Sequence, residues 1–198
     1  MRWTEAQDDA DRTPAAATAP VNDKALRRGS LAHSLLQALP DIAADERRCR
    51  ATTFLAQAAA DWAADECNDL RDSVLAVLDE PAFAPLFAPG SRAEVAIAGQ
   101  FDNGDGGIAV SGRIDRLAIT PDQILIIDYK TNRPAPTELA AVPAGYVRQL
   151  ALYRALLAAL YPGRTITVAL LWTDVPALMP IPAAALDTAR KLRAGPAL

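Results

Sequence analysis

The sequence contains few of the residues that build disulfide frameworks and metal clusters. It has only two cysteines, Cys49 and Cys67, and a single histidine in 198 residues. Two cysteines in a segment with helical character are too few for a zinc or iron–sulfur site and argue against a disulfide framework. We therefore expect a reducing, cytoplasmic setting.

Long apolar runs and an excess of basic residues are also missing. The N-terminus lacks the basic-then-apolar order of a signal peptide, so no membrane segment is expected. The 20 Lys and Arg residues are outnumbered by 24 Asp and Glu residues, which gives a net charge of −4. This balance argues against a nucleic-acid coat protein but allows an enzyme that contacts nucleic acid locally. No GxxxxGK[ST] motif is present, so the sequence contains no nucleotide-driven motor.

The residues that are present predict one domain after a tail. Residues 1–23, rich in Ala, Asp, Thr and Pro, are expected to form a flexible linker, and 24–198 the domain. Composition is globular, with 51% hydrophobic residues. Periodicity predicts helices over 26–40 and within 41–79, then strands at 92–100, 107–120 and 123–130, a helix at 146–163, a strand at 165–173 and a helix at 183–194. This order predicts an α/β fold in which helices flank a mixed sheet, preceded by an N-terminal helical segment.

Two details of the helices are also predicted. Ser30 is a candidate cap for the first helix, which Pro40 would stop. One apolar stripe is expected to bury the helix over 146–163 against the core, and it consists of Tyr146, Leu150, Tyr153, Leu157 and Leu160.

The stretch ILIIDYKTNRP, 124–134, combines a fully apolar strand with charged residues at its end. Residues two apart in a strand share a face, so Asp128 and Lys130 project together while Tyr129 points the other way. Their burial is costly unless they pair with each other or bind something. The triplet alone is compatible with a structural ion pair.

The preceding strand offers a second carboxylate. A tight turn at 120–122 would join the strands as an antiparallel hairpin and bring Asp115 level with Asp128. Two carboxylates at one place repel unless a proton or cation lies between them, and oxygen ligands suit Mg²⁺ or Mn²⁺. Asp115 as a partner of Arg113 or Arg116 is the plain alternative.

Further polar residues recur at helical spacing. Gly29 and His33 lie four apart on one face of the first helix, as do Gln149 and Tyr153 on the helix after the DYK strand. A lone helical histidine is more often a surface or capped residue, and Tyr153 also fits the core.

Four of these segments together resemble the PD-(D/E)XK nuclease superfamily, specifically its RecB-type nuclease domains. The family motifs GxxxH, GxxD, DYKT and QxxxY appear here in order as GSLAH, GRID, DYKT and QLALY, at 29–33, 112–115, 128–131 and 149–153. The resemblance covers about 24–195 and is greatest to the C-terminal nuclease domain of AddA-type helicase–nuclease subunits. It implies a restriction-endonuclease-like core.

The resemblance also implies roles for individual residues. Asp115 and Asp128 would hold Mg²⁺ or Mn²⁺, with His33 as a third ligand and the Tyr129 backbone carbonyl as a further one. Lys130 would position the attacking water and, with the two aspartates, form the catalytic group. Site-shaping or DNA-contacting roles fall to Gln149, Tyr153, Arg113 and Arg133. Independently of the resemblance, the acidic charge balance predicts weak affinity for DNA in isolation, with any attraction coming from local arginines such as Arg113, Arg116, Arg133 and Arg148. Glu94 would be an outer-shell acid.

By the same resemblance, the protein is expected to be a magnesium-dependent DNA nuclease acting in double-strand-break repair and recombination. Its substrate would be single strands produced by a helicase domain of an AddA-type chain, in cis or in trans, together with an AddB-type partner subunit. With two cysteines, the iron–sulfur cluster of some relatives is not expected. The alternative is a catalytically inactive nuclease fold that binds DNA or a partner subunit.

Overall fold

The fold is an α/β arrangement around one mixed sheet. The computed structural model describes residues 3–5, 23–101, 108–120 and 122–191. Its elements in chain order are β1 Trp3–Glu5, α1 Asp23–Ala38, α2 Ala44–Ala58, α3 Ala64–Asp79, β2 Ser91–Phe101, β3 Ile108–Ile119, β4 Gln123–Lys130, α4 Ala144–Leu160, β5 Thr165–Trp172, β6 Ala177–Pro180 and α5 Ala183–Lys191. Short 3-10 segments lie at Leu39–Asp41, Pro81–Phe87 and Leu139–Ala141.

Strand pairing places the central strands β3, β4 and β5 side by side. β3 and β4 pair antiparallel with Arg116 opposite Ile127, which confirms the predicted hairpin. β4 and β5 run parallel, connected through α4, and β6 adds an antiparallel edge strand that the sequence analysis did not predict. β2 pairs antiparallel along nearly all of β3, and β1 pairs parallel with the first residues of β3. The mixed sheet expected from the sequence is therefore confirmed.

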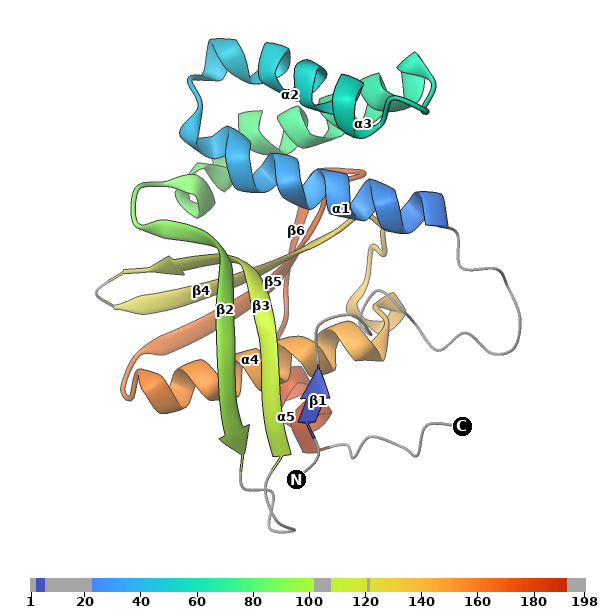
Figure 1. The fold of residues 1–198 in the computed structure, drawn as a ribbon. Helices are drawn as coiled ribbons and strands as arrows, with labels where there is room; N and C mark the ends of the chain where they lie inside the picture. The colour runs from blue at the N-terminus through green and yellow to red at the C-terminus, as the bar shows by residue number, and fades with distance from the viewer. Residues whose placement is uncertain (1–2, 6–22, 102–107, 121, 192–198) are drawn as a thin grey trace.

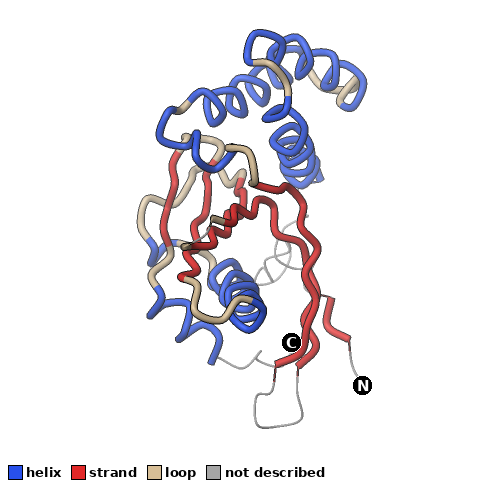
Figure 2. Tube along the Cα trace, turned by 90° about the vertical axis from the view of Figure 1, so that its left-hand side faces the viewer, coloured by secondary structure: helices blue, strands red, loops and turns tan. Residues whose placement is uncertain are grey.

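Helices cover the sheet on both faces. In Figure 1, α1, α2 and α3 lie above the strands, and α4 and α5 lie below β4 and β5, beside the lower parts of β2 and β3; the rotated view of Figure 2 agrees. Each side has its own buried cluster, and β4 contributes to both. Ile124 and Ile126 pack toward α4, whereas Ile127 and Tyr129 pack toward the N-terminal helices. This two-sided burial explains why the β4 sequence is apolar without alternation.

One buried arginine connects the sheet to the N-terminal helices. Arg116 on β3 is only 4% exposed. Its Nη2 donates to the Leu36 carbonyl on α1 at 2.7 Å, and its Nε donates to the Tyr129 hydroxyl at 3.1 Å. The Phe87 ring lies against its guanidinium. The expectation that Arg116 attracts DNA is therefore wrong, because its charge is inside the protein.

Three smaller expectations are settled or limited by the structure. Leu160, expected in the core, is 65% exposed at the end of α4, although the other four residues of its stripe are buried. Ser30 does not cap α1: it lies inside the helix, and its hydroxyl donates to the Leu26 carbonyl. The linker expected over 1–23 stays a prediction, since 1–2 and 6–22 lie outside the described residues.

Among the helices that the structure describes, none combines the length and the apolar character needed to cross a membrane.

Candidate active site

The two predicted carboxylates meet where β3 and β4 separate. The strand pairing of the hairpin ends at Arg116 and Ile127, so Asp115 and Asp128 are the next residues along the diverging strands. Asp115 Oδ2 accepts a hydrogen bond of 2.6 Å from the Tyr129 backbone N–H. Both carboxylates are buried, at 8% and 4% exposure. The fork between the strands therefore holds two acidic groups away from bulk water.

Lys130 balances one of these carboxylates. Its Nζ lies 2.9 Å from Asp128 Oδ2 and 4.0 Å from the centre of the Tyr146 ring. Burial raises the pKa of Asp128 to about 6; Lys130 opposes the rise and Asp115 adds to it. Burial would lower the pKa of Lys130, but the nearby carboxylates, Asp128 first and Asp115 second, together outweigh burial and raise it. The lysine is thus held as a buried ammonium next to the Asp128 carboxyl group.

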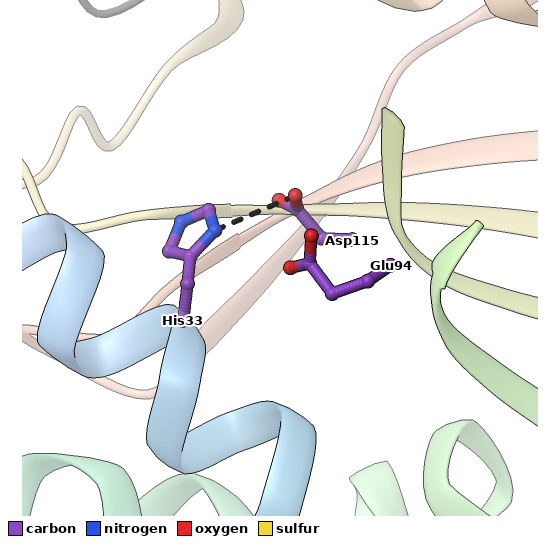
Figure 3. A group of neighbouring side chains, drawn as sticks. All are labelled: His33, Glu94 and Asp115. Atoms are coloured by element: carbon purple, nitrogen blue, oxygen red, sulfur yellow. Dashed lines mark ion pairs between the residues drawn. The ribbon is translucent and has the colours of Figure 1, made fainter. Parts of the chain in front are cut away.

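His33 reaches the same fork from α1. Its Nδ1 lies 3.4 Å from Asp115 Oδ1, and its Nε2 lies 3.2 Å from the Tyr129 carbonyl oxygen. Figure 3 shows the imidazole directed at Asp115. Burial, the largest single effect, lowers the pKa of His33, but the nearby carboxylates, Asp115 first and Asp128 second, together outweigh burial and raise the pKa to about 9. The imidazolium is therefore paired with Asp115 and lies within hydrogen-bond distance of the Tyr129 carbonyl.

Glu94 on β2 completes this group more closely than the sequence analysis expected. One ligand atom each from His33, Glu94 and Asp115 lie within 4.8 Å of one another. Glu94 has a backbone φ of 52°, which is left-handed, and it has no partner in the β2–β3 register, which pairs Ala93 and Val95 on either side of it. Such strain in a residue other than glycine is characteristic of functional sites. Strand alternation does not reveal this local distortion, so from the sequence Glu94 was expected only as an outer-shell acid of the metal site.

The donor set fits a hard divalent cation. Two carboxylates and an imidazole approach one another from three different elements, with the Tyr129 carbonyl beside the imidazole. Asp128 Oδ2 is buried and has no hydrogen-bond partner of suitable geometry among the described residues, although the Lys130 charge lies next to it. Carboxylate and carbonyl oxygens suit Mg²⁺ and Mn²⁺. Asp128 lies beside the close trio rather than within it, paired with Lys130.

The remaining predicted residues brace the site or lie at its edge. Tyr153 is buried; its hydroxyl accepts hydrogen bonds from the Gln149 side chain at 3.0 Å and from the Arg113 backbone N–H at 3.3 Å. This fastens α4 to β3 two residues before Asp115. The Arg113 side chain lies 3.4 Å from Glu94. Arg133 lies 2.7 Å from Asp69 and 2.6 Å from Asp174.

Substitution of Gly112 by alanine should destabilise this brace. A Cβ at Gly112 would lie 2.2 Å from the Tyr153 hydroxyl oxygen, so the strand or the ring must move. We expect Gly112→Ala to lower the free energy of unfolding by about 1–3 kcal/mol, the usual cost of overpacking. Urea unfolding measures it. Gly145→Ala is the matched control, because its Cβ meets nothing within 4 Å and it should be neutral or stabilising. Equal effects at both glycines would contradict the close approach.

The His33 contacts predict how stability depends on pH without metal. The folded pKa, about 9, lies above the reference value of 6.5, so the stabilisation is complete below pH 6.5 and is lost as pH rises through 9. The side chain is 29% exposed, which reduces the effect to about 2 kcal/mol. In EDTA, the wild type should lose about this much more stability between pH 6.5 and 9.5 than His33→Asn. Parallel curves for the two proteins would refute the contact.

Comparison with known proteins assigns the family. A model of the PD-(D/E)XK nuclease superfamily matches residues 9–190. Among curated proteins, none matches the sequence. One solved structure that matches, the crystal structure of SSO0001, is 16% identical and covers 80% of this chain and 71% of that one, with a TM-score of 0.34. The assignment therefore rests on the family model, with which the mixed sheet and its flanking helices agree. The chain belongs to the PD-(D/E)XK nuclease superfamily.

Proposed function

We propose that this protein is a metal-dependent DNA nuclease of the RecB type. One observation carries the proposal: the end of β4 brings Asp128 and Lys130 next to Asp115, with His33 and Glu94 closing the fork. Metal-dependent phosphodiester hydrolysis uses a cation site and a positioned proton-transfer or charge-stabilising group side by side. The superfamily match supports nuclease chemistry in general.

The proposed roles follow from the contacts. Asp115, Glu94 and His33 would hold Mg²⁺ or Mn²⁺, with Asp128 and the Tyr129 carbonyl available beside them. The bound ion would supply Lewis-acid chemistry, polarising the phosphate and lowering the pKa of a water. Binding requires His33 to give up one of its two N–H protons, since a ligating imidazole is neutral.

Among the side chains of the site, Lys130 is proposed to act on the attacking water and on the phosphate. Asp128 and the Tyr146 ring hold its ammonium in place. The ammonium can therefore donate a hydrogen bond in a fixed direction with little further loss of side-chain entropy. It would orient the attacking water and stabilise the negative charge that develops on the phosphate oxygens. Asp128 holds Lys130 in place and faces the same fork as Asp115.

The substrate and the partners complete the proposal. The four RecB-type motifs support single-stranded DNA as substrate, delivered by the helicase domain of an AddA-type chain in cis or in trans, with an AddB-type subunit, during double-strand-break repair in the cytoplasm. The net charge of −4 supports weak DNA affinity in isolation. An inactive binding module is disfavoured because the acids and the lysine are all present and adjacent.

Metal removal tests the proposal directly. Labelled single-stranded DNA should be cut by the purified chain in Mg²⁺ or Mn²⁺, not in EDTA, and cutting should return when metal is restored in excess. Asp115→Asn should stay inactive in both conditions and thereby exclude a contaminating nuclease. Absence of metal-dependent cutting even with helicase and partner subunits added would overturn the proposal and leave the inactive-module alternative.

A further inference from the structure

A cavity of about 700 Å³ adjoins the catalytic fork on the side where β4 ends. It is enclosed by the first turns of α1, the start of α3 with the turn before it, and the loop after β4. Thr131 and Asn132, which directly follow Lys130, form one wall. Tyr146 lines the cavity while its ring also lies against the Lys130 ammonium. A strand with a phosphate at the fork would therefore have this cavity within reach of its neighbouring nucleotides.

The N-terminal helices contribute one aromatic residue to the lining. Trp62, in the turn between α2 and α3, lines the cavity and is half-buried. Cations lie over its ring: Lys24 Nζ and the Arg27 guanidinium carbon are each 5.6 Å from a ring centre. These contacts hold the indole plane in position. An indole beside a nucleic-acid path is a stacking surface for an unpaired base.

The charge of the lining distinguishes a base from a phosphate. Three basic residues, Lys24, Arg28 and Arg133, face three acids, Asp65, Glu66 and Asp69, so the lining has no net charge. The three basic side chains are moreover paired with these acids. Lys24 contacts Glu66, and Arg28 and Arg133 contact Asp69 at 2.8 and 2.7 Å. A phosphate would meet carboxylates here, which disfavours it. A neutral, planar group rich in hydrogen-bonding edges fits such a lining.

The same cavity also offers groups that bind the edges of a base. Asn132 accepts a hydrogen bond from the Tyr146 hydroxyl at 3.2 Å, which orients its amide at the cavity wall. The Arg28 side chain is largely buried, and burial, together with the nearby charge of Arg133, lowers its pKa. Hydrogen-bond donors and acceptors thus line the same cavity as Trp62, as in sites that accept a base removed from a stack.

We infer that this cavity, which we name the base pocket, receives one unpaired base of the substrate strand next to the phosphate that is cut. The inference rests on the proposed nuclease function and gives the unpaired base of its substrate a place in the structure. A base held in a duplex cannot enter without the cost of unpairing. The base pocket thereby accounts for a preference for single strands without requiring a basic groove.

Abasic substrates test the base pocket. We use single-stranded thymidine oligonucleotides in which one abasic site is moved along the strand, and measure kcat/KM for cutting in Mg²⁺. For the wild type, an abasic site at one position relative to the cut should lower kcat/KM by about 5- to 150-fold, the effect of one lost stacking contact. In Trp62→Leu this penalty should vanish, and Trp62→Phe should restore it.

Phe54→Leu is the matched control, since Phe54 is another half-buried aromatic packed on the N-terminal helices but is outside the lining of the base pocket. It should keep the wild-type penalty, and thermal unfolding should show that all variants are folded. A penalty that persists in Trp62→Leu, or no penalty at any position in the wild type, overturns the base pocket while cutting of the intact strand still supports the nuclease.

A binding measurement tests the base pocket independently of the proposed nuclease activity. Anisotropy of the same labelled oligonucleotides, measured in EDTA, reports the pocket without any cutting. Weaker binding of one abasic oligonucleotide by the wild type but not by Trp62→Leu would support the base pocket even if no strand were cut. Equal binding of all oligonucleotides by both proteins, together with no cutting, would overturn the pocket and the proposed function together.

Discussion

Replacing Lys130 with methionine is expected to lower the rate of metal-dependent DNA cutting by at least about 1,000-fold. Groups that position a proton or stabilise developing charge contribute about 100- to 10,000-fold each. Lys130 is the buried ammonium in the described part of the fork, and its Nζ is fixed by Asp128 and Tyr146. Methionine keeps much of the length and the apolar stem but has no charge and no donor.

The fold should survive this substitution near neutral pH. Without Lys130, the pKa of Asp128 rises further, because burial and Asp115 both favour its neutral form. The buried carboxyl then protonates instead of remaining as an unpaired charge. Lys130→Met should therefore unfold cooperatively, with a stability loss that is smallest at low pH.

Two companion variants make the result specific. Lys130→Arg keeps the charge but replaces a point donor with a planar fork, and it should also cut slowly. Arg48→Met removes an exposed cation, paired with Asp72 on the N-terminal helices, and should cut at the wild-type rate. Cleavage by Lys130→Met within tenfold of the wild type would remove the lysine from the mechanism.

The largest effect on stability is expected at Arg116. In Arg116→Met, the Leu36 carbonyl and the Tyr129 hydroxyl lose their buried donor, and each such group costs about 1–3 kcal/mol. We expect a loss of about 3 kcal/mol in the free energy of unfolding, measured by urea titration. DNA binding should not weaken beyond what unfolding explains, since the guanidinium does not face solvent.

Graded substitutions separate the contacts of Arg116. Tyr129→Phe removes only one acceptor and should cost about 1 kcal/mol. Arg48→Met, at an exposed ion pair, should change stability by less than about 0.5 kcal/mol. If Arg116→Met were as stable as Arg48→Met, the arginine would not hold α1 against the sheet.

The sequence predicted the fork between β3 and β4 because its placement depends on local rules. The sequence predicts a short connection between the two strands, and the resulting hairpin register, with Ile119 opposite Ile124, puts Asp115 level with Asp128. Side-chain alternation then gives the common face of Asp128 and Lys130. The GxxxH spacing likewise gave the helical face of His33, but its contact with Asp115 required the packing of α1 on the sheet.

Other features depend on contacts between distant segments and could not be read from spacing. Glu94 joins the trio because the backbone of β2 takes a left-handed conformation at that residue. Arg116 resembles any exposed arginine on a strand until α1 covers it. Trp62 has no neighbour in the chain that suggests a cavity, which arises only where α1, α3 and the loop after β4 meet.

The position of His33 makes the catalytic fork a joint between two layers. Its helix, α1, belongs to the N-terminal layer, whereas Asp115 and the Tyr129 carbonyl belong to the sheet. A cation held by all three would tie α1 down, so amide hydrogens of Leu35 and Leu36 should exchange with solvent more slowly in Mg²⁺ than in EDTA. Hydrogen exchange along α1 would thus report occupancy of the fork in a protein that carries no substrate.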